Sequence, residues 1–142
     1  MKTPAQLLPC IARILLGLVF FVFGLNGFLN FMPQPREMPE GAVSLFGAFQ
    51  KTGYMMPLIF GTQVVVGALL LLNRFVPLAL ALIAPVIVHI VAVHLFIVPS
   101  GLPVAVVVLA LELYLAWVYR KSYQPMLVMR ATPACRKEGC VK

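Results

Sequence analysis

The chain has 142 residues, of which 62% are hydrophobic and 11% are charged, and its mean hydropathy is +1.01. A soluble domain carries about 25% charged residues, so this composition excludes a soluble enzyme or binding module. The net charge of +7 does not indicate a nucleic-acid partner, because the basic residues lie mostly at the ends of apolar segments. The sequence therefore predicts an integral membrane protein in contact with the lipid bilayer.

Four apolar stretches are each long enough to cross about 30 Å of hydrocarbon as a helix. They are Leu7–Met32, Tyr54–Asn73, Phe75–Val98 and Gly101–Tyr119. The sequence predicts an all-α fold, an integral membrane four-helix bundle over residues 1–125, followed by a basic tail over residues 126–142. We expect the first stretch to be a retained helix, because it is too long for the core of a cleaved signal peptide.

The segment between the first two stretches has a different character. Its first part, Pro33–Gly41, contains three prolines and cannot be helical throughout. Its second part, Ala42–Thr52, places Val43, Phe46 and Phe49 at near-helical spacing but is too short to cross a membrane. We expect a short helix that lies in the outer interface and covers the bundle there, with an ordinary apolar linker as the alternative.

The basic residues predict the orientation of the chain. If four helices alternate in direction, two basic residues, Arg36 and Lys51, fall on one side. The remaining ones fall on the other side, which makes that side cytoplasmic and places both termini there; they are Lys2, Arg13, Arg74, Arg120, Lys121, Arg130, Arg136, Lys137 and Lys142.

All three cysteines would lie on the cytoplasmic side, where thiols stay reduced. Cys135 and Cys140 have a spacing compatible with a metal loop or a redox pair. Without a second pair of ligands, incidental thiols in a flexible tail are the favoured interpretation.

Several polar residues fall inside the apolar stretches. A carboxylate near the bilayer midplane costs several kcal/mol, so Glu112 needs a partner or a function. At 1.5 Å per residue, Gln63, His89 and Glu112 lie roughly 14, 15 and 16 Å below the outer boundary, on three different helices. His94, Asn26 and Asn30 form a second layer closer to the outside, with the two asparagines four residues apart on one helix face.

This arrangement favours a polar pocket in the outer half of the bundle. His89 and Glu112 could exchange a proton there, as the reduction of a quinone requires, and His94 would assist them. Asn26, Asn30 and Gln63 would bind the quinone ring, and apolar walls would come from Phe60, Phe96, Tyr114 and Trp117.

Two alternatives remain open. Glu112, His89 and Gln63 could satisfy one another and lock the helix packing, or Arg13 could pair with Glu112. A metal or haem is not expected, because His89 and His94 are five residues apart and point in different directions from one helix.

Small residues recur along three of the stretches. Gly17 and Gly24 lie in the first stretch, Gly61 and Gly67 lie in the second, and Ala105 and Ala116 lie on either side of Glu112 in the fourth. In lipid, such residues allow two helix backbones to approach closely where apolar burial provides no driving force. We expect them to form the contacts between helices.

Five segments of the chain resemble the DoxX family of small membrane proteins, in order and without large gaps. They are residues 12–28 (ARILLGLVFFVFGLNGF), 53–54 (GY), 67–80 (GALLLLNRFVPLAL), 94–96 (HLF) and 99–103 (PSGLP). The resemblance covers about residues 7–125. The individual positions that match the family pattern are Asn26, Gly27, Asn73, Arg74 and His94. Members often carry Asn where this chain has His89.

The resemblance implies a four-helix bundle in a bacterial cytoplasmic (inner) membrane. It also implies a relation to the DoxD-type subunits of a thiosulfate:quinone oxidoreductase, and hence quinone as a cofactor or substrate. No flavin, haem or iron–sulfur motif is visible in the sequence, so the electrons would come from a partner or a small reductant.

We therefore expect a membrane subunit of a quinone-linked oxidoreductase system, either a homo-oligomer or part of a larger membrane complex. The sequence leaves open whether the chain is itself an enzyme. The alternatives are a structural or assembly subunit without catalytic activity and a small-molecule carrier.

Overall fold

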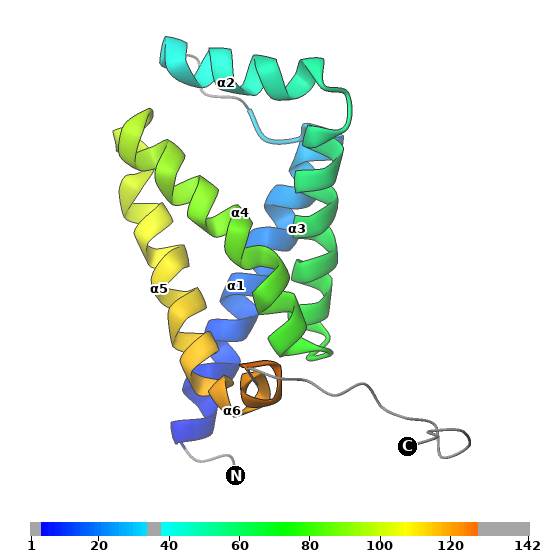
Figure 1. Cartoon of the computed structure of the whole chain (residues 1–142), viewed down its shortest axis with the longest axis vertical. Helices are drawn as coiled ribbons and strands as arrows, with labels where there is room; N and C mark the ends of the chain where they lie inside the picture. The colour runs from blue at the N-terminus through cyan, green and yellow to red at the C-terminus, as the bar shows by residue number, and fades with distance from the viewer. Residues whose placement is uncertain (1–3, 34–37, 128–142) are drawn as a thin grey trace, which may run out of the picture.

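The computed structural model describes residues 4–33 and 38–127, and every regular element in them is helical (Figure 1). The all-α fold is thus confirmed for the described residues. Cys135, Cys140 and residues 128–142 of the expected tail lie outside them. The elements are α1 (Pro4–Leu29), α2 (Glu40–Lys51), α3 (Met55–Leu71), α4 (Val76–Phe96), η1 (Pro99–Gly101), α5 (Leu102–Val118), α6 (Arg120–Tyr123) and η2 (Gln124–Leu127).

Three helical segments are long and apolar enough to cross a membrane, namely Leu7–Leu29, Val76–Phe96 and Pro99–Val118. Helix α3 has 17 residues, which is at the short end of the range for a spanning helix. It qualifies as a span only together with α2, from which it is bent by 93°. The chain is therefore a multi-pass membrane protein with three to four candidate spans.

Helix α2 crosses the top of the bundle nearly at right angles to α3, as Figure 1 shows. It begins at Glu40, earlier than expected, and ends at Lys51, so acidic and basic side chains stand at the helix ends that favour them. Thr52 bridges the bend, since its hydroxyl accepts from the Met55 N–H at 3.2 Å. Gly53 follows with φ +75°, a left-handed conformation that suits glycine.

Helices α1 and α3 form the most extensive contact between elements of the described residues. Glycines on both helices make this contact close. A Cβ on Gly67 would lie 2.5 Å from the Phe21 backbone nitrogen, and a Cβ on Gly24 would lie 2.8 Å from the Val64 nitrogen. The expected packing role is confirmed for these two glycines and for Gly17, but Gly61 has open space around it.

The hydrophobic core begins at the end of the bundle farthest from α2 and reaches Ile87 of α4 and Val108 of α5. Its largest fully buried side chains include Phe20, Leu16, Leu70, Ile83 and Leu115, from four different helices. At the same end, a short turn joins α3 to α4 through Asn73 and Phe75, both with left-handed φ values of 55° and 50°. The four long helices are thus held together firmly at one end of the bundle.

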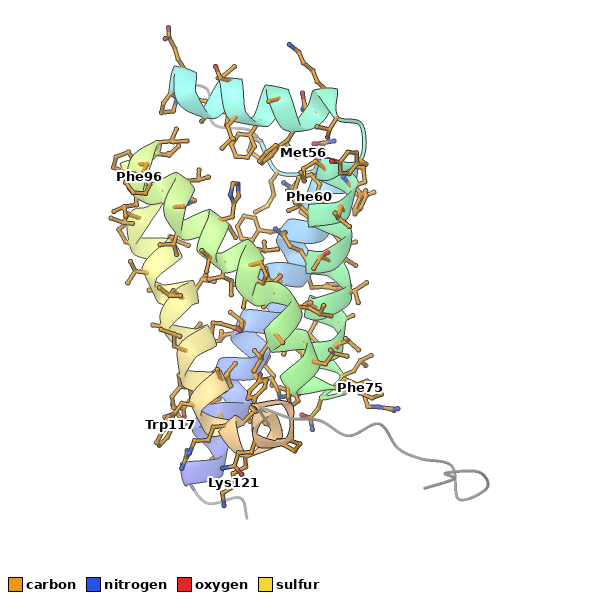
Figure 2. The ribbon with its side chains drawn as sticks, in the orientation of Figure 1. Met56, Phe60, Phe75, Phe96, Trp117 and Lys121 are labelled. Carbon is orange, nitrogen blue, oxygen red and sulfur yellow. The ribbon has the colours of Figure 1, made fainter. Side chains whose placement is uncertain are left out.

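Basic and aromatic side chains gather at this end as well. The Arg74 guanidinium lies 5.9 Å from the centre of the Phe75 ring, and that of Arg120 lies 4.5 Å from the centre of the Trp117 ring. Figure 2 shows Phe75, Trp117 and Lys121 pointing outward from the bundle here. Aromatic rings next to basic groups are typical of the boundary between the hydrocarbon and the headgroups.

The two glycines of α3 provide a matched test of the packing. Gly67→Ala should lower the free energy of unfolding by about 1–3 kcal/mol, because the added methyl group meets the rigid backbone of α1. Gly61→Ala should cause no loss, because its Cβ would lie in open space. Unfolding in mixed micelles, followed by circular dichroism, measures both variants. Equal destabilisation by the two substitutions would contradict the described contact.

Candidate functional site

A cavity of about 380 Å³ lies under α2, in the upper part of the bundle where α3 and α4 diverge (Figure 1). Helix α2 supplies its roof, and α3 and α4 supply its sides. Most of the lining is apolar, with two methionines and three phenylalanines. The lining residues are Phe46, Phe49, Met55, Met56, Ile59, Phe60, Gln63, Pro85, Val86, His89, Ile90, Val93 and His94.

Gln63 is the buried polar group of this cavity. Its side chain is only 7% exposed, and its Oε1 atom has no hydrogen-bond partner among the described residues. Its Cβ lies close to Gly24 of α1, where an added Cβ would come within 3.0 Å of it. An unpaired buried carbonyl oxygen costs about 1–3 kcal/mol. A ligand that donates a hydrogen bond in the cavity would remove this cost.

The two histidines of α4 line the same cavity in different ways. The imidazole of His89 is exposed, and its ring centre lies 5.5 Å from that of Phe49 in the roof. The Nδ1 atom of His94 lies 2.7 Å from the carbonyl oxygen of Ile90. Because a carbonyl only accepts, Nδ1 carries the hydrogen, and Nε2 of the neutral ring is left as an acceptor. The ring of His94 rests on Gly101, where a Cβ would overlap it.

Phe60 forms an aromatic wall of the cavity. Its ring fits over Gly27, where a side chain would overlap it, and it makes an edge-on contact with Phe28 at 6.1 Å between ring centres. Figure 2 shows Phe60 and Met56 on α3 directly below α2. Phe96 lies elsewhere: it is 80% exposed at the upper end of α4 and does not line the cavity.

The two asparagines cap the end of α1 and do not line the cavity. The Oδ1 atom of Asn26 accepts a hydrogen bond from the Met32 N–H at 2.7 Å. Asn30 is exposed, has a left-handed φ of 50°, and its N–H donates to the Asn26 carbonyl at 2.8 Å. Asparagine a few residues before a proline, here Asn30 and Pro33, is a signal for a helix C-terminus, and this signal could have indicated the capping role.

Glu112 lies outside the cavity wall. It is 5% exposed, and its Oε2 atom has no hydrogen-bond partner among the described residues. It shares a face of α5 with the core residues Val108 and Leu115. Burial and, second, the charge of Glu112 raise the pKa of Tyr123 in α6.

Arg13 does not serve as the partner of Glu112. One of its Nη atoms donates to the carbonyl oxygen of Leu70, in the last turn of α3, and the other lies 3.7 Å from the Cys10 sulfur. The guanidinium therefore satisfies a carbonyl at a helix end, where orphan acceptors need a donor. The alternative in which the polar residues satisfy one another does not describe Gln63 and Glu112, which each keep an unpaired oxygen.

The structure thus brings together Gln63, His89, His94 and Phe60, and separates them from Glu112, Asn26, Asn30 and Phe96. Sequence reasoning did not find the other cavity residues, notably Phe46 and Phe49 of the roof. The apolar face of the short helix predicted that it covers the bundle but not which of its side chains lie over the cavity.

Comparison with known proteins identifies a protein family that the chain matches. The family model described as DoxX matches residues 8–98, which include α2, α3, α4 and every residue of the cavity. This match is shorter than the resemblance expected from the sequence and does not extend over α5. No curated protein and no solved structure matches the chain.

The unpaired oxygen of Gln63 makes a prediction for the ligand-free protein. Gln63→Leu should raise the free energy of unfolding by about 1 kcal/mol, because an apolar side chain of similar size replaces an unsatisfied buried group. Thermal unfolding of the delipidated protein measures the change. Thr62→Val is the control, since the Thr62 hydroxyl already donates to Leu58 within its helix. A marked loss of stability in Gln63→Leu would show that the amide is satisfied.

Proposed function

This chain belongs to the DoxX family, and we propose that it binds a quinone head group in the cavity under α2. In this proposal it serves as a membrane subunit of a quinone-linked oxidoreductase system. The observation that carries the proposal is the unpaired oxygen of Gln63, which is buried in the wall of a largely apolar cavity. A planar ring with two polar oxygens suits such a site, because apolar walls bind the ring and a few polar groups orient it.

The polar groups of the cavity suit both redox states of the ligand. A quinol carries hydroxyl groups, and one of them can donate to Oε1 of Gln63. A quinone carries carbonyl oxygens, and one of them can accept from the imidazole of His89. Reduction of a quinone takes up two electrons and two protons. His89 lines the cavity and is the group that would exchange protons with the bound ring, whereas the electrons come from a partner protein or a small reductant.

Glu112 has a separate place in this proposal. Because it lies in the packed half of the bundle and away from the cavity, it contacts no bound quinone there. Its unpaired oxygen can hold a proton inside the bundle, and we propose that it supports turnover and not binding. Glu112→Gln should retain quinone affinity and lose quinone-dependent turnover, and a loss of affinity would contradict this division.

Quinone binding can be tested with one ring in its two redox states. Gln63→Leu should weaken binding of a tailless dimethoxy-methylbenzoquinol by about three- to tenfold, the worth of one hydrogen bond, and should affect the oxidised quinone less. His89→Leu should weaken the oxidised form more. Anaerobic titration calorimetry in lipid nanodiscs measures both. Val88→Ala, on the exposed face of α4 beside His89, is the matched control.

Two other outcomes would favour the alternatives. Firm co-purification with partner chains, no bound quinone and no effect of the cavity variants would favour a structural or assembly subunit. Flux of a small solute into proteoliposomes without quinone would favour a carrier. A homo-oligomer or a larger membrane complex is compatible with all three functions.

We also propose that the chain lies in a bacterial cytoplasmic membrane with both termini inside. The support is the cluster of Arg74, Arg120 and Lys121 at the end of the bundle opposite α2. In a variant without the native cysteines, Ser44→Cys on α2 should react with a membrane-impermeant maleimide in intact cells. Ser122→Cys on α6 should react only after lysis, and the reverse pattern would contradict the orientation.

A further inference from the structure

A second hollow, of about 260 Å³, lies on the outer face of α3. Its wall runs along α3 from Pro57 to Val66 and is completed by Leu82 of α4. Leu58, Val65 and Leu82 are each about half exposed, so this face contacts lipid when the helices span a membrane. We call this hollow the outer groove.

The outer groove is open and apolar. Gly61 has no atom of the described residues within 4 Å of the position of a Cβ, whereas Gly24, Gly27 and Gly67 are each closed off by a neighbouring helix. The hydroxyl of Thr62 donates to the Leu58 carbonyl at 2.8 Å, so it leaves no unsatisfied donor in the groove. The groove therefore has room for a chain-like apolar group and provides nothing to bind a polar one.

The outer groove adjoins the cavity along the seam between α3 and α4. On α3, Ile59 and Gln63 line the cavity, while their neighbours Thr62 and Val66 line the groove. On α4, Leu82 of the groove lies one turn below Val86 of the cavity, because α4 runs upward toward α2. The two hollows share no lining residue, so a ligand with its ring against Gln63 would cross this seam between α3 and α4 to place a tail in the groove.

We propose that the outer groove holds the tail of a lipid-soluble quinone whose ring occupies the cavity, an inference that rests on the proposed function. The ligand is then a long-tailed isoprenoid quinone taken sideways from the bilayer, and not a water-soluble quinone. The chemistry divides accordingly: Gln63 and His89 bind the ring oxygens, and Gly61 leaves room for the hydrocarbon chain.

Two quinone probes with the same ring distinguish the contribution of the tail to binding affinity from that of the ring. One is the tailless dimethoxy-methylbenzoquinone and the other carries a decyl chain. Gly61→Leu should weaken binding of the decyl compound by roughly tenfold and change the tailless affinity by less than about twofold. Comparison of each variant with the wild type in the same nanodiscs cancels the partitioning of the tail into lipid. Val107→Leu, on the exposed face of α5, is the control.

A photoreactive diazirine at the end of the decyl chain locates the tail directly. Labelling should map to the peptide that contains Pro57–Val66 of α3 and should fall in Gly61→Leu. Labelling on α5, or equal loss of both affinities in Gly61→Leu, would overturn the tail assignment while leaving the ring site in place. If neither probe binds the wild type, the proposed function itself fails and the tail assignment fails with it.

Discussion

The close contact between α1 and α3 is the constraint on which the rest of the structure depends. In a bilayer, apolar burial does not drive two helices together, so their association rests on van der Waals packing at short range. Gly24 and Gly67 permit that range, because each brings its backbone against the facing helix. The same contact positions the cavity wall: Gln63 backs onto Gly24, and the ring of Phe60 covers Gly27. Packing between two helices thus determines where the polar group of the site points.

A consequence is the division of the bundle into a packed half and an open half. At the end opposite α2, Leu16, Leu70 and Leu115 close the core, and the short turn before α4 keeps α3 and α4 together. Toward α2 the two helices diverge (Figure 1), and the cavity lies between them, lined in part by Val86 and Ile90, which also pack against the core. Helix α2 lies over this space and covers it with Phe46 and Phe49.

The sequence predicted the elements well because a spanning helix needs about 20 consecutive apolar residues, and such runs are easy to recognise. The expected stretches agree with α1, α3, α4 and α5 to within three residues at each end, and the short helix before α3 was also expected. Three of the polar residues, Gln63, His89 and His94, do share one cavity. The grouping with Glu112 rested on depth alone. Depth along a helix says nothing about the direction of a side chain around it, and Glu112 lies on the face of α5 that carries the core residues Val108 and Leu115.

Asn26 and Asn30 show the same limit for a different reason. Their spacing places them on one face of α1, but they lie where the helix ends. There the side chain of Asn26 accepts a hydrogen bond from the backbone, and Asn30 adopts a left-handed backbone conformation. The end of a membrane helix is hard to place from hydropathy, since Leu29 and Phe31 continue the apolar run beyond the last turn. A polar residue near such an end can therefore be a cap or a ligand-binding group, and only the fold decides between them.

The two unpaired side-chain oxygens of the described residues, on Gln63 and Glu112, differ in their surroundings. Both Gln63 and Glu112 carry a desolvation cost, but only Gln63 faces a cavity in which another molecule can fit. Glu112 shares its face of α5 with core residues and does not line the cavity. An unpaired buried amide oxygen lowers the stability of the empty protein. A ligand that donates a hydrogen bond to this oxygen removes that free-energy cost, and the same free energy then favours binding. The instability of Gln63 in the empty cavity and the affinity of the site for a hydrogen-bond donor are thus two aspects of one interaction.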